Sequence, residues 1–301
     1  MQSAFKRYEK KYLITCEQSA AVQQVIKEHM SLDRYGEYSV SNLYYDTENW
    51  SVIRASIEKP AFKEKLRLRY YGAITDIVTD TSKLYLELKK KYRGVVYKRR
   101  IELAAAAYDG SNIRTIVSDT PSQIARELSF YLQSNAVTER VYLAYQRTAF
   151  SGKKDAGLRI TFDSDVRFRL DDLNLNCTKA GQRLIPSDNM LMEIKTLGGM
   201  PMWLARALSE VCVFPTTFSK VGMCYIEHVL NADNNSNNNS DDSNSRGSKH
   251  NNSDDNNISE SNNNNSNSSL KSSDSYRVAN NNDSISAHAH ENCERRVKTC
   301  A

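Results

Sequence analysis

The sequence predicts an α+β fold in which a mainly antiparallel β-sheet closes into a tunnel barrel, with helices flanking it. Two observations carry this prediction. Segments with strand character outnumber helical segments in the 301-residue chain, and the β-α-β alternation of parallel sheets is absent. In addition, strand after strand combines one charged face with one apolar face. The prediction therefore depends on a repeated pattern and on no single motif.

The predicted strands are short runs with a two-residue period that end at turn-forming residues. Gly94 separates two such runs and marks a hairpin, and Asp46 ends an earlier run. Strands are expected at residues 4–15, 40–47, 61–72, 83–92, 95–103, 139–150, 157–170 and 190–197.

Four helices are predicted, and their apolar stripes would cover the apolar faces of the sheet. The first spans residues 15–30, with Thr15 as its N-cap. The second, 121–133, has Pro121 near its first turn. The others are expected at 201–214 and just after residue 220.

The composition changes near residue 231, where a tail made largely of Asn and Ser begins. The tail has too few large apolar residues to offset the entropy of ordering, so residues 231–301 are predicted to be disordered. It holds seven of the 41 Lys and Arg residues and ten of the 36 Asp and Glu residues, which leaves residues 1–230 with a formal net charge of +8. Residues 1–230 are expected to form one basic domain.

A cytoplasmic location is expected. The sequence has no apolar stretch typical of a secretory signal, and its six cysteines show no CxxC spacing. No run of 18 or more apolar residues predicts a membrane span.

The stretch KEKLRLRYYG at 63–72 shows the charged face most clearly. Its side chains alternate between the two faces of a strand, so the cations share one face and the leucines share the other. The same division recurs in later strands. The residues on the charged face include Lys63, Lys65, Arg67, Arg69, Glu87, Lys89, Lys91, Lys98, Arg100, Glu102, Glu9, Lys11, Tyr145, Arg147, Arg159, Asp163, Glu193 and Lys195.

On an open sheet, these like charges would repel one another across neighbouring strands, and no other interaction would offset this repulsion. If the sheet closes with the charged faces inward, the cations line a channel of low dielectric constant that needs a polyanion to neutralise it. Phosphate groups suit Arg and Lys. Carboxylates such as Glu193 suit a divalent cation that bridges phosphate oxygens, or an ion pair with a neighbouring cation.

A run of motifs in order carries a family resemblance. They are RYEKKYLI at 7–14, NLYYDT at 42–47, KLRLRYY at 65–71, LELKKKYRGVVYKRR at 86–100, YQRTAF at 145–150, LRITFD at 158–163, LMEIK at 191–195 and FSK at 218–220. Together they resemble the VTC-type polyphosphate polymerase domain, a branch of the CYTH-like triphosphate tunnel metalloenzymes. The similarity covers about residues 4–230.

The resemblance implies a transferase that binds ATP with Mn²⁺ or Mg²⁺ and passes the γ-phosphoryl group to a growing polyphosphate chain. It also implies a role for each matching position. The cations that match phosphate-binding positions are Lys11, Arg67, Arg69, Lys89, Lys98, Arg147, Arg159 and Lys220, and six of these, Arg67, Arg69, Lys89, Arg147, Arg159 and Lys220, are the predicted catalytic residues. Tyr145 and Ser219 match supporting phosphate contacts, and Glu193 matches the metal ligand.

The chain departs from the family pattern at two places. Thr217 stands where members often have a further Lys, and the first strand keeps only Glu9 and Lys11 of the paired-glutamate signature of the hydrolytic branch. Eukaryotic members commonly carry an SPX domain and a membrane segment, which this sequence does not show. A separate membrane partner is therefore expected if the polymer crosses a membrane.

Three alternatives remain at this stage. A tunnel hydrolase would pass the phosphoryl group to water, and a non-catalytic module would bind polyphosphate without turnover. Nucleic-acid binding is the third alternative, suggested by the basic charge and by the pairs Tyr44–Tyr45 and Tyr70–Tyr71. However, adjacent strand residues point to opposite faces, so these pairs form no single stacking surface. The expected ligands are ATP and polyphosphate, and no nucleic acid.

The predicted crowding of cations has a consequence for stability. If the stretch at 63–72 lines the tunnel, Arg67→Ala should abolish turnover and leave the melting temperature unchanged or raised, because it relieves repulsion among buried cations.

Overall fold

The computed structural model describes residues 8–72, 82–93, 95–110, 112–175, 177 and 179–231. The chain divides into two units, Met1–Ala232 and Asp233–Ala301, and all the described residues belong to the first. Residues 232–301 lie outside the described part, so the domain division at 230 and the disorder of the tail stay predictions.

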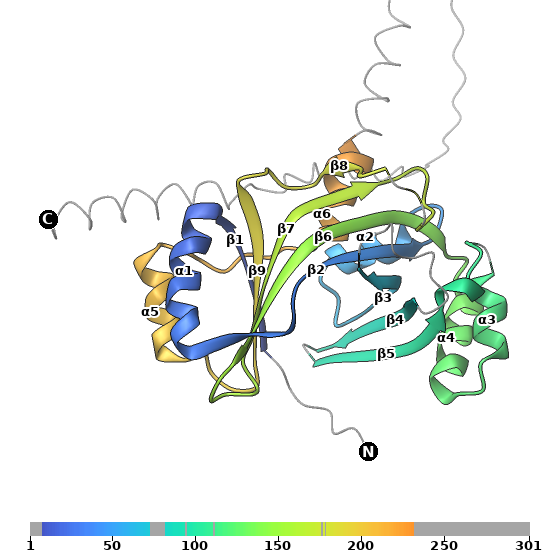
Figure 1. The fold of residues 1–301 in the computed structure, drawn as a ribbon. Coiled ribbons are helices and arrows are strands. Elements are labelled where there is room, and N and C mark those ends of the chain that lie inside the picture. Colours follow the sequence, from blue (N-terminus) through green and yellow to red (C-terminus); the bar gives the residue numbers. More distant parts are fainter. Residues whose placement is uncertain are drawn as a thin grey trace, which may run out of the picture. The chain divides into compact units, whose positions relative to one another are not determined.

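The structure confirms the α+β class (Figure 1). The strands are β1 (Tyr8–Thr15), β2 (Met30–Asp46), β3 (Phe62–Tyr71), β4 (Lys83–Tyr92), β5 (Val95–Ala104), β6 (Thr138–Gly152), β7 (Arg159–Arg169), β8 (Gln182–Arg183) and β9 (Asn189–Thr196). The helices are α1 (Cys16–His29), α2 (Ser51–Ile57), α3 (Ile113–Asp119), α4 (Gln123–Ser134), α5 (Met202–Glu210) and α6 (Lys220–Tyr225), with a 3₁₀ turn, η2 (Ala105–Ala107), and a π-helical turn, η3 (Ile226–Leu230).

All strand pairs are antiparallel, in one nine-stranded sheet with the order β1-β9-β7-β6-β2-β3-β4-β5 and with β8 beside β7. The end strands β1 and β5 do not pair with each other among the described residues, so backbone hydrogen bonds do not close the barrel. Instead, the outer edge of β1 forms a bridge through Lys11 to Thr216.

The sheet curves until its two ends approach. The Lys89 ammonium on β4 lies 3.7 Å from a carboxylate oxygen of Glu9 on β1. In a flat sheet these strands would be about 29 Å apart, given a strand spacing of about 4.8 Å. The predicted tunnel is therefore present, although its wall is completed by side chains along one line.

The apolar faces of the strands point outward and are covered by helices, as predicted. Beneath α3 and α4 lie Leu66, Leu86 and Leu88, all fully buried. A second cluster joins α1 and α5 to β1, β7 and β9 through residues such as Ile26 and Ile160. Figure 1 shows these two helix pairs at opposite ends of the sheet.

A third cluster lies on the inner side of β6 and is formed by α2 and α6. Ile53 of α2 and Val221 of α6 share it with Val40 and Tyr145. These helices therefore occupy part of the space inside the curved sheet and bring the start of α6 close to the charged residues.

The helix predictions were largely correct. Thr15 caps α1 in a capping box with Gln18, and Ser122 caps α4. Two short helices, α2 and α3, were missed, and β2 begins ten residues earlier than predicted. No helix in the described part of the chain is long and apolar enough to cross a membrane.

The division between outer core and inner face can be tested with Leu86→Ala. Because Leu86 is fully buried, we expect a loss of about 2–5 kcal/mol of unfolding free energy in urea titrations. Leu13→Ala is the control, since Leu13 is 41% exposed and its removal should cost less than about 0.5 kcal/mol. Equal losses in the two variants would contradict this assignment of faces.

Candidate active site

The inner face of the sheet brings the predicted site residues together. Directly opposed residues in antiparallel strands share a face, and the register opposes Lys11 to Glu193, Lys89 to Lys98 and Arg159 to Lys195. All the predicted positions lie on this face or at its edge: Lys11 on β1, Arg67 and Arg69 on β3, Lys89 on β4, Lys98 on β5, Tyr145 and Arg147 on β6, Arg159 on β7, Glu193 on β9, and Ser219 and Lys220 at the start of α6. The functional roles of these residues stay predictions.

Glu87 on β4 is the centre of one cation cluster. Its side chain is 1% exposed, and one carboxylate oxygen accepts hydrogen bonds from Nε and Nη2 of Arg67 at 3.0 and 2.8 Å. Lys98 pairs with the other oxygen, and Arg69 and Arg100 lie 3.9 Å away. One carboxylate thus holds four cations from the two strands that flank β4.

The charge balance around Glu87 corrects one expectation. Burial raises the pKa of Glu87, but Arg67, Arg69 and Lys98 outweigh it and lower the pKa to about 2. Arg67 also donates to the Tyr44 hydroxyl at 3.0 Å. Loss of Arg67 therefore removes attractive contacts as well as repulsive ones, which favours a lower melting temperature over the unchanged or raised one expected from the sequence.

Asp163 on β7 is the centre of a second cluster. The fully buried carboxylate accepts two hydrogen bonds from Arg147, at 2.6 and 2.8 Å, and one from the Lys220 ammonium at 2.5 Å. Burial raises the pKa of Asp163, but Lys220 and Arg147 lower it by more than burial raises it. The pKa is therefore below its usual value, and the group stays ionised. Asp163 therefore fixes two predicted phosphate-binding cations from different elements.

Tyr145 supports cations through its ring and its hydroxyl. The Lys220 ammonium lies 4.3 Å from the ring centroid, and the Arg147 guanidinium lies 5.1 Å from it. The Tyr145 hydroxyl accepts from Arg69 at 3.2 Å, while Arg69 also donates to Asn42 at 2.8 Å. Tyr145 therefore positions three cations, and the phosphate contact predicted for it stays a prediction.

The FSK segment at 218–220 connects opposite walls of the tunnel. The Lys11 ammonium of β1 donates to the Phe218 carbonyl at 2.9 Å, and the Lys65 ammonium of β3 donates to the Ser219 hydroxyl at 3.1 Å. Lys220 reaches Asp163 of β7. Three strands that are distant in sequence therefore meet at one short segment.

Glu193, the predicted metal ligand, lies opposite Lys11 and forms an ion pair with Lys195. Burial raises its pKa, but Lys195 and Lys11 outweigh burial and hold the pKa well below its usual value. Arg159 is nearer the solvent, with 42% of its side chain exposed, and it donates to Asp33 at 2.7 Å.

The lysines of this face are held in an unfavourable charge environment. Burial, together with the charges of Lys11, Lys63 and Lys89, lowers the pKa of Lys65 to about 8. The pKa of Lys89 and that of Lys98 are also lowered, with burial as the largest cause. A bound polyanion would relieve this positive potential.

The described residues contain no group of three His, Cys, Asp or Glu side chains that could hold a metal ion by themselves. They do fit a metal carried by a triphosphate, because Mg²⁺ commonly takes one or two carboxylates and completes its shell with phosphate oxygens and water. Thr161 lies directly opposite Glu193, and its hydroxyl is buried with no hydrogen-bond partner. Glu193 and Thr161 together offer two oxygen ligands on adjacent strands.

Sequence reasoning gave no role to several residues of this site. Glu87 and Asp163 were placed on the charged face, but their function as shared counter-ions was not predicted. Tyr44 was interpreted as a packing residue. Burial raises its pKa, but Arg67 and Arg69 reverse this and lower the pKa to about 7. The alternating pattern could identify the face of each residue, but only the strand register shows which charges meet.

Comparison with known proteins identifies the family. A model described as VTC domain matches residues 6–229. The chain belongs to the VTC domain family. This VTC domain combines a curved antiparallel sheet with the basic inner face described above. No curated protein matches the chain.

Solved structures with a related arrangement are distant. A Hippeastrum protein reported to have a dominant triphosphatase activity is 17% identical, with a TM-score of 0.42 over 71% of this chain and 92% of that chain. A Vibrio parahaemolyticus protein is 12% identical, with a TM-score of 0.38 over 73% and 98%. A Mimivirus capping enzyme triphosphatase is 12% identical, with a TM-score of 0.30 over 67% and 88%. Because these scores are low, the family assignment depends on the family model.

The buried carboxylate at position 87 should stabilise the unliganded VTC domain. We expect Glu87→Gln to cost roughly 3–5 kcal/mol of unfolding free energy, because it leaves the surrounding cations unpaired. Tripolyphosphate should raise the melting temperature of this variant more than that of the wild type. Glu102→Gln is the matched control, since Glu102 is about half exposed and, within the described part of the chain, forms its ion pair with exposed Lys83. A Glu87→Gln protein as stable as the control would refute the counter-ion role.

Two groups of the site should make anion binding depend on pH. As the pH rises, Tyr44 gains a negative charge near pH 7 and Lys65 loses its positive charge near pH 8, so both changes weaken tripolyphosphate binding. Isothermal titration calorimetry between pH 6.5 and 9 should show a flatter profile for Tyr44→Phe below pH 8 and for Lys65→Arg above it. The ionisation of the ligand is common to all the titrations and cancels in the comparison. Identical profiles for all three proteins would contradict this assignment.

The same lysine gives a test without ligand. Its folded-state pKa lies below the ordinary value of 10.5, so the unfolded chain binds more protons between these two values. The contribution of Lys65 to unfolding free energy should therefore increase as the pH rises from about 8 towards 10.5, and Lys65→Arg should remove this increase.

Proposed function

We propose that this VTC domain is a polyphosphate polymerase that transfers the γ-phosphoryl group of ATP to a polyphosphate chain. The observation that supports the proposal most directly is the inner face itself. Among the described residues it carries more cations than carboxylates, and several of its lysines have lowered pKa values. Such a face stabilises a long polyanion along its whole length.

The chemistry needs positioning and charge neutralisation, and it needs no covalent intermediate with the protein. A terminal oxygen of the polyphosphate would attack the γ-phosphorus, a new P–O–P bond would form, and the bond between the γ-phosphorus and the β,γ-bridging oxygen would break to release ADP. Arg147 and Lys220, held by Asp163, would stabilise charge on the transferring group. Arg67 and Arg69 would bind the other phosphates.

The divalent cation would be Mn²⁺ or Mg²⁺, held by Glu193 and the hydroxyl of Thr161. It would supply neutralisation of phosphate charge. The ion pair between Glu193 and Lys195 would then have to open, which leaves Lys195 available for a phosphate oxygen.

The proposed ligands are ATP and polyphosphate, with no nucleic acid. The tyrosine pairs support this reading, because Tyr45 and Tyr70 lie in the apolar core while Tyr44 and Tyr71 contact arginines of the tunnel face. They form no continuous outer surface for stacking of successive bases. We further propose a cytoplasmic location and a separate membrane partner if the polymer is moved across a membrane.

The full chain should be incubated with ATP, with and without Mn²⁺, and the products resolved on a gel stained for polyphosphate beside a free-phosphate assay. We expect a ladder of polymer with ADP, little free phosphate, and dependence on the metal. Free phosphate without polymer would instead identify a hydrolase that uses the same tunnel, and tight ATP binding without either product would identify a regulatory module.

Arg67→Ala should lower polymer synthesis by at least roughly 100-fold, by analogy with the loss of one preorganised donor to a transition state. Its melting temperature should fall as well, because the hydrogen bonds to Glu87 are lost. Arg99→Ala is the matched control on the outer face of β5, where Arg99 pairs with Glu127 of α4. Equal activity of the two variants would exclude a role for Arg67 in turnover.

A further inference from the structure

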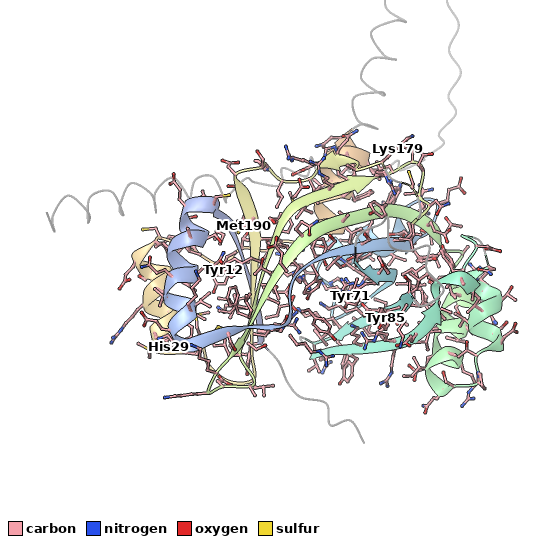
Figure 2. The ribbon with its side chains drawn as sticks, viewed as in Figure 1. Tyr12, His29, Tyr71, Tyr85, Lys179 and Met190 are labelled. Carbon is pink, nitrogen blue, oxygen red and sulfur yellow. The ribbon has the colours of Figure 1, made fainter. Side chains whose placement is uncertain are left out.

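Four tyrosines form a continuous array on β2, β3 and β4, called here the tyrosine rim: Tyr35, Tyr38, Tyr71 and Tyr85. Neighbouring rings meet edge to face, with centroid separations of 5.9 Å for Tyr35–Tyr38, 6.1 Å for Tyr38–Tyr71 and 5.6 Å for Tyr71–Tyr85. Figure 2 shows Tyr71 and Tyr85 next to each other between the ribbons of β2 and β5. The proposed phosphate chemistry makes no use of these rings.

The rim lies on the same face as the phosphate-binding cations, at the end of β3. Tyr71 is the last residue of β3, and Tyr85 is directly opposite Arg69. Arg67 is four residues from Tyr71 along the strand, which corresponds to about 14 Å at 3.4 Å per residue. The rings therefore mark one end of a row of arginines.

The rim is partly open to solvent. Tyr35 is 58% exposed and Tyr71 is 36% exposed, whereas the core residues Tyr45 and Tyr70 are 3% and 6% exposed. Large apolar groups gathered in one accessible place commonly mark a binding site. Packing alone does not account for this array.

A phosphate group makes no direct contact of its own with aromatic rings, although the rings hold neighbouring arginines. The face of an aromatic ring carries negative potential, so it does not attract an anion. A ligand that combines phosphates with a flat, apolar ring would use both halves of the surface, because bases of every kind stack on aromatic side chains. A nucleotide has this composition.

Two arginines lie against the rings of Tyr71 and Tyr85 in the tyrosine rim. The Arg69 guanidinium lies 5.5 Å from the centroid of Tyr71 and donates to its hydroxyl at 3.2 Å. The Arg100 guanidinium lies 4.5 Å from the centroid of Tyr85. A ligand that extends from the rings along β3 would contact the Arg69 guanidinium before it reaches Arg67.

The geometry points to a nucleobase subsite at the tyrosine rim. The base of a nucleoside triphosphate contacts Tyr71 and Tyr85, and its phosphates extend along Arg69 and Arg67. This inference rests on the proposed function only in taking the ligand to be a nucleotide. It can be tested by binding, without turnover.

The test compares two ligands that share a triphosphate and differ in the base. Calorimetry on the full chain should use β,γ-imido-ATP and inorganic tripolyphosphate, each with Mn²⁺. Tyr85→Leu should weaken binding of the ATP analogue roughly 5- to 150-fold, which corresponds to the loss of one base–aromatic stack. Binding of tripolyphosphate should change less than about twofold, since phosphate contacts remain.

Two further variants make the comparison specific. Tyr85→Phe keeps the ring and should bind the ATP analogue as the wild type does. Tyr97→Leu is the matched control, because Tyr97 is 40% exposed on the other face of β5, opposite Lys90. It should change neither affinity.

Equal losses for the two ligands in Tyr85→Leu would overturn the subsite, since they would show that the ring only supports the tunnel wall. An unchanged affinity for the ATP analogue would overturn it too, as would a wild-type protein that binds neither ligand. The two proposals can fail separately. A result that contradicts the base subsite does not change the outcome of the polymer assay. Likewise, an absence of polymer does not change the ratio of the affinities for the ATP analogue and tripolyphosphate.

Discussion

Repulsion among like charges is the constraint on which the arrangement of this tunnel depends. The sheet places cations from several strands on one inner face, and two buried carboxylates make this possible. Glu87 of β4 holds two arginines of β3 and a lysine and an arginine of β5, while Asp163 holds Arg147 of β6 and Lys220 of α6. The carboxylates leave part of the positive charge unpaired, so the folded protein retains a strong attraction for anions. The cations of the inner face thus favour anion binding, while their mutual repulsion lowers the stability of the fold.

The alternating pattern was sufficient to predict the inner and outer faces, because a two-residue period fixes the face of each side chain in β3 and β4. Thr15 was likewise predictable as a cap from its local sequence. The partners of Glu87 were not, since they depend on the register of three strands. The FSK segment posed a similar problem, because its contacts with Lys11, Lys65 and Asp163 join residues far apart in the chain. The short helix α2 carries too few turns for a periodic signal, and its N-cap residue, Trp50, has a left-handed backbone that is uncommon for a tryptophan.

Under the proposed function and the inferred base subsite, the row of arginines on β3 and the tyrosine rim would divide substrate recognition between two kinds of surface. Cations bind any chain of phosphates, including the product, and so they cannot by themselves distinguish donor from acceptor. Aromatic rings contact only a ligand that carries a base. With the rim at one end of the row, the donor would have a defined orientation, and its γ-phosphoryl group would lie farthest from the rings. The difference between a polymerase and a hydrolase would then depend on what occupies the position beyond that group: a phosphate oxygen or a water molecule.

The line where β1 approaches β4 differs from the rest of the tunnel wall. Elsewhere in the described sheet, neighbouring strands are joined by ladders of backbone hydrogen bonds, but here the link is an ion pair between Lys89 and Glu9, with 42% and 24% of their side chains exposed. Exposed ion pairs contribute little and are screened by salt, with a Debye length of about 8 Å at physiological ionic strength. The wall therefore has a seam. Under the proposed function, a chain of phosphates would enter sideways through this seam without threading an end through the bore, and higher salt would weaken the ion pair that spans it.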